Sequence, residues 1–545
     1  MFDSTYMARR YSGRVISRIG SWWVSGPGIL WIAGSLVAIA LLIPVVYLLL
    51  RALGAGNAAW EELISVRTTR ILGRTIWLAF SVTLCCGFLA VPLAWLTVRS
   101  DLPMRRMWAV LTPLPLVVPS YVGAYLMISV LGPRGLLQHW LEPLGVQRLP
   151  DIYGFPGAFL VLTMLSYPYV LLSTRAALLR MNPAMEEAAR NLGSGPWSTF
   201  WRVTLPQLRP SLVAGGLLVT LYVLRDFGAV SLMRYSTFTR AIFLQYQSSF
   251  DRTMAAILAL VLVLIAMIIL ALDVRTRGRA SYHGGDVGSV GSAVTVRLGL
   301  WRWPSFCFCF AVVTLGLVMP AGVLLLWLVR GISAGVDLSS LWVSALNSLL
   351  TSGAAAGLAL VAAIPVAVLS VRYVGRASSI LERVSYAAFA LPGMVVALAL
   401  VFFGANYARP LYQTMALLLF GYVILFLPEV VGALRASLLQ LSPSLEHAAR
   451  TLGRGPLDVF RTITLPITWP GMAAGVVLVF LTAMKELPVT LILSPLGFRT
   501  LSTSVWSAVS EAFFALAAAP ALLLIILSSL PMAMLVMRER ERIYE

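Results

Sequence analysis

Long apolar stretches separated by short polar segments run through the whole chain. A helix needs about 20 apolar residues to cross the roughly 30 Å hydrocarbon core of a bilayer, and about twelve stretches approach or exceed that length. They lie at 28–51, 76–98, 107–131, 157–178, 211–232, 254–273, 306–329, 345–370, 384–403, 413–435, 471–493 and 513–536. Because these stretches lack the alternating pattern of membrane barrel strands, they predict an all-α polytopic membrane protein.

Composition supports this class and restricts the chemistry. Hydrophobic residues make up 59% of the 545 residues and charged residues 12%, with a mean hydropathy of +0.87. The net charge of +19 comes mainly from arginines in short loops beside apolar stretches, so we expect no nucleic-acid partner. The four cysteines lie in apolar stretches and the three histidines are scattered, so we expect no metal site. We find no phosphate-binding loop or catalytic constellation and expect no enzyme.

Arginine placement predicts how the helices are oriented. Arginines are frequent near the N-terminus, in the loop at 99–106 and in the tail, whereas the loops at 132–156 and 330–344 carry fewer and mixed charges. The positive-inside rule therefore places both termini in the cytoplasm. The stretch that begins at Gly28 is too long for the core of a signal peptide, so we interpret it as a retained anchor. Each half holds an even number of spans, which predicts two parallel six-helix repeats.

One polar segment occurs twice, 260 residues apart, each time between two apolar stretches. The equivalent residues are Glu186, Glu187, Ala188, Ala189, Gly193 and Pro206 in the first copy, and Glu446, His447, Ala448, Ala449, Gly453 and Pro466 in the second. A duplicated polar loop suggests a docking surface that a two-fold partner uses twice. A helix resting on lipid headgroups would explain one such loop, but two copies with the same Gly and Pro positions favour docking.

Each copy predicts two short helices that lie along the membrane face at a sharp angle. Asn182 and Ser442 are suited to cap the first helix. Gly193 and Gly453 are suited to end it, because glycine adopts the left-handed conformation without strain. A second short helix starts at the following Gly-Pro pair, and the final Leu-Pro pair marks the return toward the next span.

This segment resembles the signature loop of bacterial ABC importer permeases, which reads Glu-Ala-Ala, three residues, Gly, nine residues, Ile-x-Leu-Pro. The first copy fits from Glu187 through Pro206, and the second from Ala448 through Pro466 with His447 in place of the Glu. That replacement leaves the polar contact of the second loop open. The resemblance covers essentially the whole chain and implies the type I importer permease fold. It also implies that each loop docks in an ATP-hydrolysing subunit and couples its closure to the membrane gate.

The resemblance further implies a fused arrangement. The first permease unit would span 1–274 with its coupling loop at 183–206, and the second 301–545 with its loop at 443–466. A flexible cytoplasmic linker at 275–300 would join them. Two copies of a separate ATPase subunit would use ATP, and this chain would bind no cofactor. An extracytoplasmic binding protein would deliver the substrate to this multi-pass protein of the bacterial inner membrane.

A finer resemblance concerns the substrate. The stretches 227–235, 484–488 and 495–501 resemble fused permeases for ferric iron. Fused thiamine permeases and unfused permeases for polyamines or molybdate remain alternatives. A secondary transporter that needs no ATPase is a more distant alternative, because it would have no use for a duplicated docking loop.

Ionisable residues within the apolar stretches are the candidates for the pathway, since such groups are costly in a bilayer. They are Arg225 and Asp226, their repeat equivalents Lys485 and Glu486, and Glu429, which takes the place of Tyr169. Carboxylates here could contact a hard cation through oxygen. Alternatively, each basic–acidic pair neutralises itself and locks helix packing. Adjacent residues on a helix point about 100° apart, which weakens that alternative.

Overall fold

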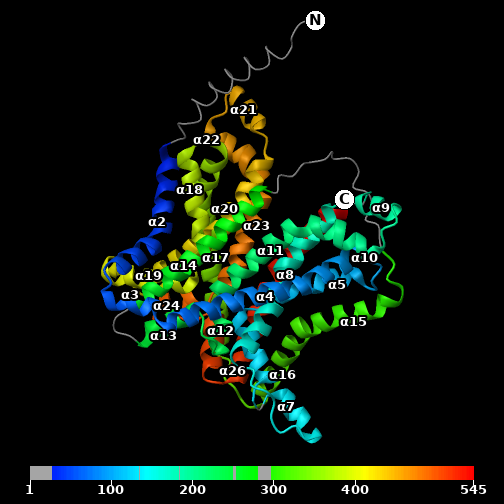
Figure 1. Cartoon of the computed structure of the whole chain (residues 1–545). Coiled ribbons are helices and arrows are strands. Elements are labelled where there is room, and N and C mark those ends of the chain that lie inside the picture. The colour runs from blue at the N-terminus through cyan, green and yellow to red at the C-terminus, as the bar shows by residue number, and fades with distance from the viewer. Residues whose placement is uncertain (1–27, 134, 183, 249–252, 280–295, 545) are drawn as a thin grey trace. The chain divides into compact units, whose positions relative to one another are not determined.

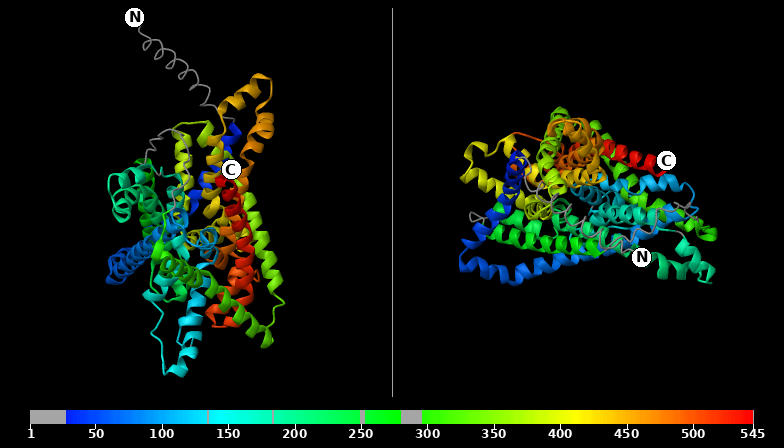
Figure 2. Two further views of the ribbon diagram at one scale, coloured as in Figure 1. Left: turned by 90° about the vertical axis from the view of Figure 1, so that its right-hand side faces the viewer. Right: turned by 90° about the horizontal axis from the view of Figure 1, so that it is seen from above.

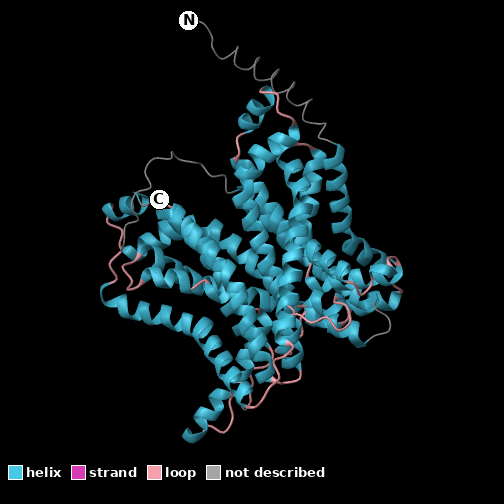
Figure 3. Cartoon of the chain, turned by 180° about the vertical axis from the view of Figure 1, so that it is seen from behind, coloured by secondary structure: helices cyan, strands magenta, loops and turns pink. Residues whose placement is uncertain are grey.

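The computed structural model describes residues 28–133, 135–182, 184–248, 253–279 and 296–544 (Figure 1). Within these ranges the regular elements are helices, and the one isolated bridge joins Ser100 to Val296 (Figure 3). Nine of the described helical segments are long and apolar enough to cross a membrane, and two bent helix pairs bring the number to as many as eleven. A shorter apolar helix at Phe514–Ser529 corresponds to the last predicted stretch. The predicted all-α membrane class is confirmed.

Most predicted spans are single helices or continuous helical segments. They are α2 (Gly28–Leu53), α4 (Val66–Arg99), α8 (Phe155–Arg180), α14 (Thr253–Arg279), α17 (Leu341–Arg372), α20 (Met415–Gln440) and the segment at Gly299–Ser333 that contains η4 (Gly299–Trp301), α15 (Arg302–Val313), η5 (Thr314–Val318) and α16 (Met319–Ser333). α4 starts ten residues before the predicted stretch, because the Ser65 hydroxyl caps it by accepting a hydrogen bond from the Thr68 amide at 3.3 Å.

The predicted spans at 107–131 and 384–403 are each a pair of helical segments with a sharp bend between them. The segment of α5 (Arg105–Leu111) and η1 (Leu114–Val117) meets the one that begins with α6 (Ser120–Leu131) at 97°. α18 (Arg376–Ala387) and η6 (Ala388–Ala390) meet α19 (Gly393–Asn406) at 106°. Both bends fall at a proline with extended backbone, Pro119 and Pro392, because proline lacks the N–H that would continue the helix.

Among the described residues, 28–47 and 347–498 belong to one compact unit, called unit 1 here. Its remaining described elements are η7 (Arg409–Leu411), α21 (Pro443–Thr451), α22 (Pro456–Val459), η8 (Phe460–Thr464), α23 (Leu465–Lys485) and α24 (Pro488–Leu493). α20 and α23 approach closely at Gly475, where an added Cβ would lie 3.2 Å from the Cα of Val430. α2 packs here through Tyr47, whose ring lies 4.6 Å from that of Phe402. α21 and α22 lie at one end of this unit (Figure 2).

Residues 48–346 and 499–545 belong to the other compact unit, unit 2. Its further elements are α3 (Asn57–Ile64), α7 (Leu136–Leu141), η2 (Glu142–Leu144), α9 (Ala184–Asn191), α10 (Pro196–Thr199), η3 (Phe200–Thr204), α11 (Leu205–Arg225), α12 (Gly228–Leu232), α13 (Phe238–Ser248), α25 (Leu501–Ser510) and α26 (Phe514–Tyr544). α4 and α11 are joined by the hydroxyls of Thr83 and Thr220, 2.9 Å apart. Tyr125 donates to the Phe514 carbonyl at 3.0 Å, which ties α6 to α26. α9 and α10 lie far from α7 within this unit (Figure 1).

The compact units do not follow the order of the repeat along the chain. Most of α2, the first span of the first half, packs with the second half, and the segments at 299–346 and 499–544 pack with the first half. The division of the sequence at 1–274 and 301–545 stays a prediction about the repeat. Most of the predicted linker, residues 280–295, lies outside the described residues. The C-terminal part of the linker is described and is hydrogen-bonded to the chain, because the Val296 amide donates to the Arg99 carbonyl at 2.8 Å.

Candidate functional site

The two repeated loops begin and end their first helices as predicted. Asn182 Oδ1 accepts a hydrogen bond from the Ala184 amide at 3.0 Å, and Ser442 Oγ accepts one from the Ser444 amide at 3.4 Å. Gly193 and Gly453 follow these helices with φ of 85° and 86°, in the left-handed region that strains other residues.

The next span of each half begins at the Leu-Pro pair, as predicted, but the second short helix runs into it without a break. α10 continues through the π-helical turn η3 into α11, and α22 continues through η8 into α23. Pro206 and Pro466 fall in the first turn that follows each π-helical turn. There the altered backbone bonding accommodates a residue without an N–H. Each second short helix and the following span therefore form one continuous helical segment, of 30 residues at Pro196–Arg225 in the first half.

Large apolar side chains are exposed on the loops as well as on the apolar spans. Leu192 and Leu452 are exposed beside the two glycines. Trp197 is 73% exposed and stacks with Phe200, the ring centroids lying 6.1 Å apart. The equivalent residue of the second loop, Leu457, is 64% exposed. The Ala-Ala pairs of the two motifs, Ala188, Ala189, Ala448 and Ala449, lie on the first helices, α9 and α21.

The two adjacent acidic positions of the motif have different surroundings. Glu187 and His447, at the motif position, are exposed. Glu186 and Glu446, one residue earlier, are only 8% and 9% exposed. Thr204 donates to Glu186 Oε1 at 2.8 Å, and Thr464 donates to Glu446 Oε1 at 2.9 Å. A buried threonine–glutamate contact is thus common to both copies, one residue before the position where His447 replaces the glutamate.

One arginine holds the start of each loop. The sequence analysis did not identify either of them. Arg372, the last residue of α17, lies with its Nε 3.1 Å from Glu446 Oε2 and donates through Nη2 to the Leu441 carbonyl at 3.3 Å. Arg99, the last residue of α4, donates through Nη2 to the carbonyls of Leu178 and Met181 at 3.3 and 3.2 Å. The repeat itself could have revealed them, since Arg99 and Arg372 are as far apart as Pro119 and Pro392.

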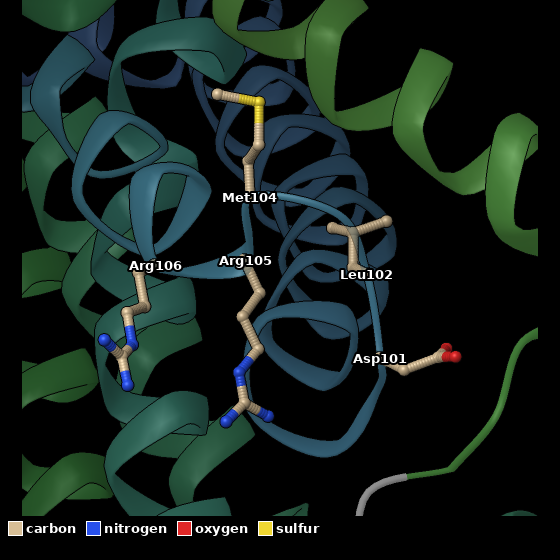
Figure 4. A pocket seen from close by; sticks show the side chains of 5 residues that line it. All are labelled: Asp101, Leu102, Met104, Arg105 and Arg106. Carbon is tan, nitrogen blue, oxygen red and sulfur yellow. The ribbon is translucent and has the colours of Figure 1, made fainter.

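An open hollow of about 470 Å³ lies in the loop that follows Arg99 (Figure 4). Its lining residues are Asp101, Leu102, Met104, Arg105 and Arg106. Asp101 accepts a hydrogen bond from the Leu298 amide at 2.8 Å, while the arginine side chains extend in a different direction in Figure 4. Two arginines on this loop fit its predicted cytoplasmic side.

Two of the intramembrane acids cap short helices after a break in their spans. Asp226 Oδ1 accepts hydrogen bonds from the amides of Ala229 and Val230 at 3.0 and 3.3 Å. Glu486 Oε1 accepts one from the Val489 amide at 3.3 Å. The predicted spans at 211–232 and 471–493 are therefore interrupted, since α11 ends at Arg225 and α23 at Lys485 before α12 and α24 begin. The two basic residues stand at helix C-termini, where the helix dipole favours positive charge.

The residues beside the two capping acids differ between the halves, and their sizes compensate for the different lengths of the acids. Ser120 forms a side-chain hydrogen bond with Asp226 in the first half. At the equivalent place in the second half is Gly393, where an added Cβ would lie 2.4 Å from Glu486 Oε1. The longer glutamate thus fills the space that a serine side chain would occupy.

The remaining candidates form different pairs in the two halves. Thr482 donates to Glu429 Oε2 at 3.1 Å, and Glu429 also interacts electrostatically with Lys485. At the positions equivalent to Glu429 and Thr482, the first half has Tyr169 and Tyr222, whose ring centroids lie 5.6 Å apart. Lys485 therefore interacts with an acid on a different helix, α20, as well as standing beside Glu486 in the chain. The first half presents phenol groups where the second presents a carboxylate.

Comparison with known proteins gives two matches to one family and several relatives. Residues 84–277 and 358–541 each match the family described as "Binding-protein-dependent transport system inner membrane component". Each matched stretch contains one of the repeated loops, so the duplication extends well beyond them.

The relatives include one protein of similar length, one longer protein and one of about half the length. The chain is 35% identical over 505 residues to the Fe(3+)-transport system permease protein FbpB 2 of Haemophilus influenzae, covering 92% of this chain and 96% of that protein. It is 24% identical over 482 residues to the ferric transport system permease protein FbpB of Actinobacillus pleuropneumoniae, covering 84% and 69%. It is also 33% identical over 267 residues to the molybdenum transport system permease protein ModB of Mycobacterium bovis, covering 47% and 94%.

Proposed function

We propose a function for this chain on the basis of its family. The chain belongs to the family of binding-protein-dependent transport system inner membrane components. It is a multi-pass permease subunit of an ABC importer, and we propose that its substrate is ferric iron. The observation that carries the substrate is the match to an Fe(3+)-transport permease over nearly the full length of both chains. A second relative named for ferric transport matches over most of this chain.

The proposed partners follow from the two loops. Two copies of an ATPase subunit would bind at 183–206 and 443–466, which would place these loops and both termini in the cytoplasm. The exposed Leu192, Trp197 and Leu457 support this, because apolar side chains of this size gain most from being covered. An extracytoplasmic binding protein would deliver iron on the opposite face. This chain would bind no cofactor, and ATP would be hydrolysed in the partner.

The proposed mechanism uses the continuous helices that run from the loops into the spans. Closure of the ATPases on ATP would move α10 and α22, and this motion would pass directly into α11 and α23. These helices end at Arg225 and Lys485, immediately before the breaks at which Asp226 and Glu486 cap the next helices. A shift at the loops would therefore reach the interrupted part of the spans and open the gate there.

Ferric iron is a hard cation that prefers oxygen ligands. Glu429, Tyr169 and Tyr222 offer carboxylate and phenol oxygens within the spans and are the proposed pathway groups. The charges of Arg225 and Lys485 would limit how tightly a cation is held there. Molybdate is the alternative substrate, because one relative is a molybdenum permease. Thiamine and polyamines are further alternatives to be tested in transport.

The test is transport by the reconstituted complex. The chain, its ATPase and its binding protein would be placed in liposomes, and uptake of radiolabelled ferric iron would be measured with and without ATP. We expect ATP-dependent iron uptake and none of molybdate, thiamine or putrescine. Uptake of another solute would overturn iron as the substrate. Iron uptake without any ATPase subunit would favour the secondary transporter instead.

A further inference from the structure

Several segments of unit 1 converge on one buried ion pair. Glu446 Oε1 accepts hydrogen bonds from Thr464 Oγ1 at 2.9 Å and from Arg372 Nη2 at 3.2 Å. Its other oxygen lies 3.1 Å from Arg372 Nε. Glu446 belongs to the docking helix α21, Arg372 ends α17, and Thr464 is the last residue of the π-helical turn before α23. The carboxylate therefore connects the docking helix to two spans at once.

Arg372 adds a third span to this network. It donates to the carbonyl of Leu441, the residue that follows α20 and precedes the loop. The ion pair therefore joins α21 to the ends of α17 and α20, in addition to the Thr464 bond that joins it to the start of α23.

Unit 2 repeats the main features of this network. Thr204, the last residue of its π-helical turn, donates to the buried Glu186 at 2.8 Å. Arg99, which is 2% exposed, donates to the carbonyl of Met181, the repeat equivalent of Leu441. Both copies thus share the threonine–glutamate bond and the arginine–carbonyl bond, which argues that these contacts have a role beyond local packing, and unit 1 adds the ion pair.

Burial separates these glutamates from the docking surface. Glu186 and Glu446 cannot reach a partner that covers the loop, whereas the exposed Glu187 and His447 can. A buried charge is costly, and apolar residues often replace a buried ion pair without loss of stability. A satisfied polar network does hold its elements in one arrangement. Such a link is suited to carry motion from one element to the next.

We propose that Glu446 and Arg372, with Glu186 as the counterpart in the first half, transmit movement of the docking helices to the membrane spans. They are positioning residues, and the exposed motif residues beside them serve to bind the ATPase. This proposal rests on the proposed function, because it requires an ATPase on the loops.

The experiment measures binding and coupling separately in the full reconstituted complex. Binding is the amount of ATPase that co-purifies with the chain, and coupling is the substrate taken up per ATP hydrolysed. We expect Glu446→Gln to keep ATPase binding and to lower uptake per ATP by about tenfold, within the usual range of coupling effects. The exchange Arg372→Glu with Glu446→Arg restores the ion pair, and uptake per ATP should return to within about threefold of the original. The matched control, His447→Gln, should weaken binding and leave uptake per ATP unchanged in the complexes that form.

Opposite outcomes would overturn the proposal. Unchanged uptake per ATP in Glu446→Gln would show that the buried acid transmits nothing. Lost ATPase binding with normal uptake per ATP would make it a docking residue. If Glu446→Gln does not accumulate as folded protein, Thr464→Val tests the same link by removing one hydrogen bond.

The proposed function can fail separately. If the original chain moves a solute other than iron, the same ratio measured with that solute still tests the coupling. If the original chain binds no ATPase, the importer mechanism and the transmission proposal fail together.

Discussion

The two repeated loops share their buried contacts and differ in what they expose. Glu186 and Glu446 accept hydrogen bonds from equivalent threonines at 2.8 and 2.9 Å. At the surface, Glu187 is replaced by His447 and Trp197 by Leu457. The contact that holds each loop to its span is therefore the part that both copies need. In the proposed complex, two identical ATPases would therefore meet two different surfaces.

The intramembrane residues show the same relation. Asp226 and Glu486 both cap the helix after a break, with Ser120 or Gly393 adjusting the space beside them. The pathway candidates nearby differ, with a tyrosine pair in one half and Glu429 with Thr482 in the other. A substrate that passed between equivalent positions of the halves would meet unlike groups.

The largest expected difference between the halves is in the stability that is lost when their arginines, Arg372 and Arg99, are replaced. Arg372→Met leaves the Glu446 carboxylate buried without its cation, and breaking a buried ion pair in this way costs about 3–5 kcal/mol. Arg99→Met removes hydrogen bonds from a cation to carbonyl oxygens, which costs about 1.5–3 kcal/mol. Thermal unfolding of the full chain in detergent would measure both, with the exposed Arg376→Met as a neutral control. Equal losses would mean that the two halves hold their loops by interactions of the same strength.

A second prediction concerns the capping acid of the second half when its surroundings are changed to those of the first half. Gly393→Ser forces a side chain against Glu486 Oε1 and should destabilise the chain by about 1–3 kcal/mol, as overpacking usually does. Adding Glu486→Asp recreates the Ser120–Asp226 pair of the first half and should recover most of that loss. The measurement is again thermal unfolding. A double variant no more stable than Gly393→Ser would contradict the equivalence of the two sites.

The sequence predicted the spans well because the bilayer fixes how long an apolar helix must be. The angles of the bends at Pro119 and Pro392 could not be predicted, since hydropathy records composition and not direction. The π-helical turns before Pro206 and Pro466 were not predicted either, because such a turn leaves no composition signal.

The site was predicted at the level of the loop but not of the side chain. The caps at Asn182 and Ser442 and the terminating glycines follow from local rules that need no tertiary structure. Which of two adjacent positions, 186 or 187, is buried depends on how the helix lies against the following span. One clue was available, because the acid recurs at 446 whereas 447 is a histidine.

A third prediction concerns the exposed side chains. Trp197→Ala should weaken ATPase binding by about 2–3 kcal/mol, because exposed tryptophans in interfaces are frequent hot spots. Leu457→Ala should cost about 1 kcal/mol, since less apolar area is lost. Binding of the purified ATPase to the full chain would measure both. Trp140→Ala, an equally exposed tryptophan on α7, should change nothing, and an equal effect of all three would remove the loops as the docking surface.

The smallest effect should be the same in both loops. Gly193 and Gly453 have almost identical left-handed φ angles, and an added Cβ would meet nothing within 4 Å at either position. Alanine at either one should therefore cost only the strain of that conformation, about 1–2 kcal/mol. ATPase binding should weaken to a similar extent in Gly193→Ala and Gly453→Ala. Gly145→Ala has the same strain at φ 86° but lies in the loop beside α7, so it should leave ATPase binding unchanged. Weaker binding in Gly193→Ala alone would mean that only the first loop holds an ATPase, and the comparison of two docking loops would fail.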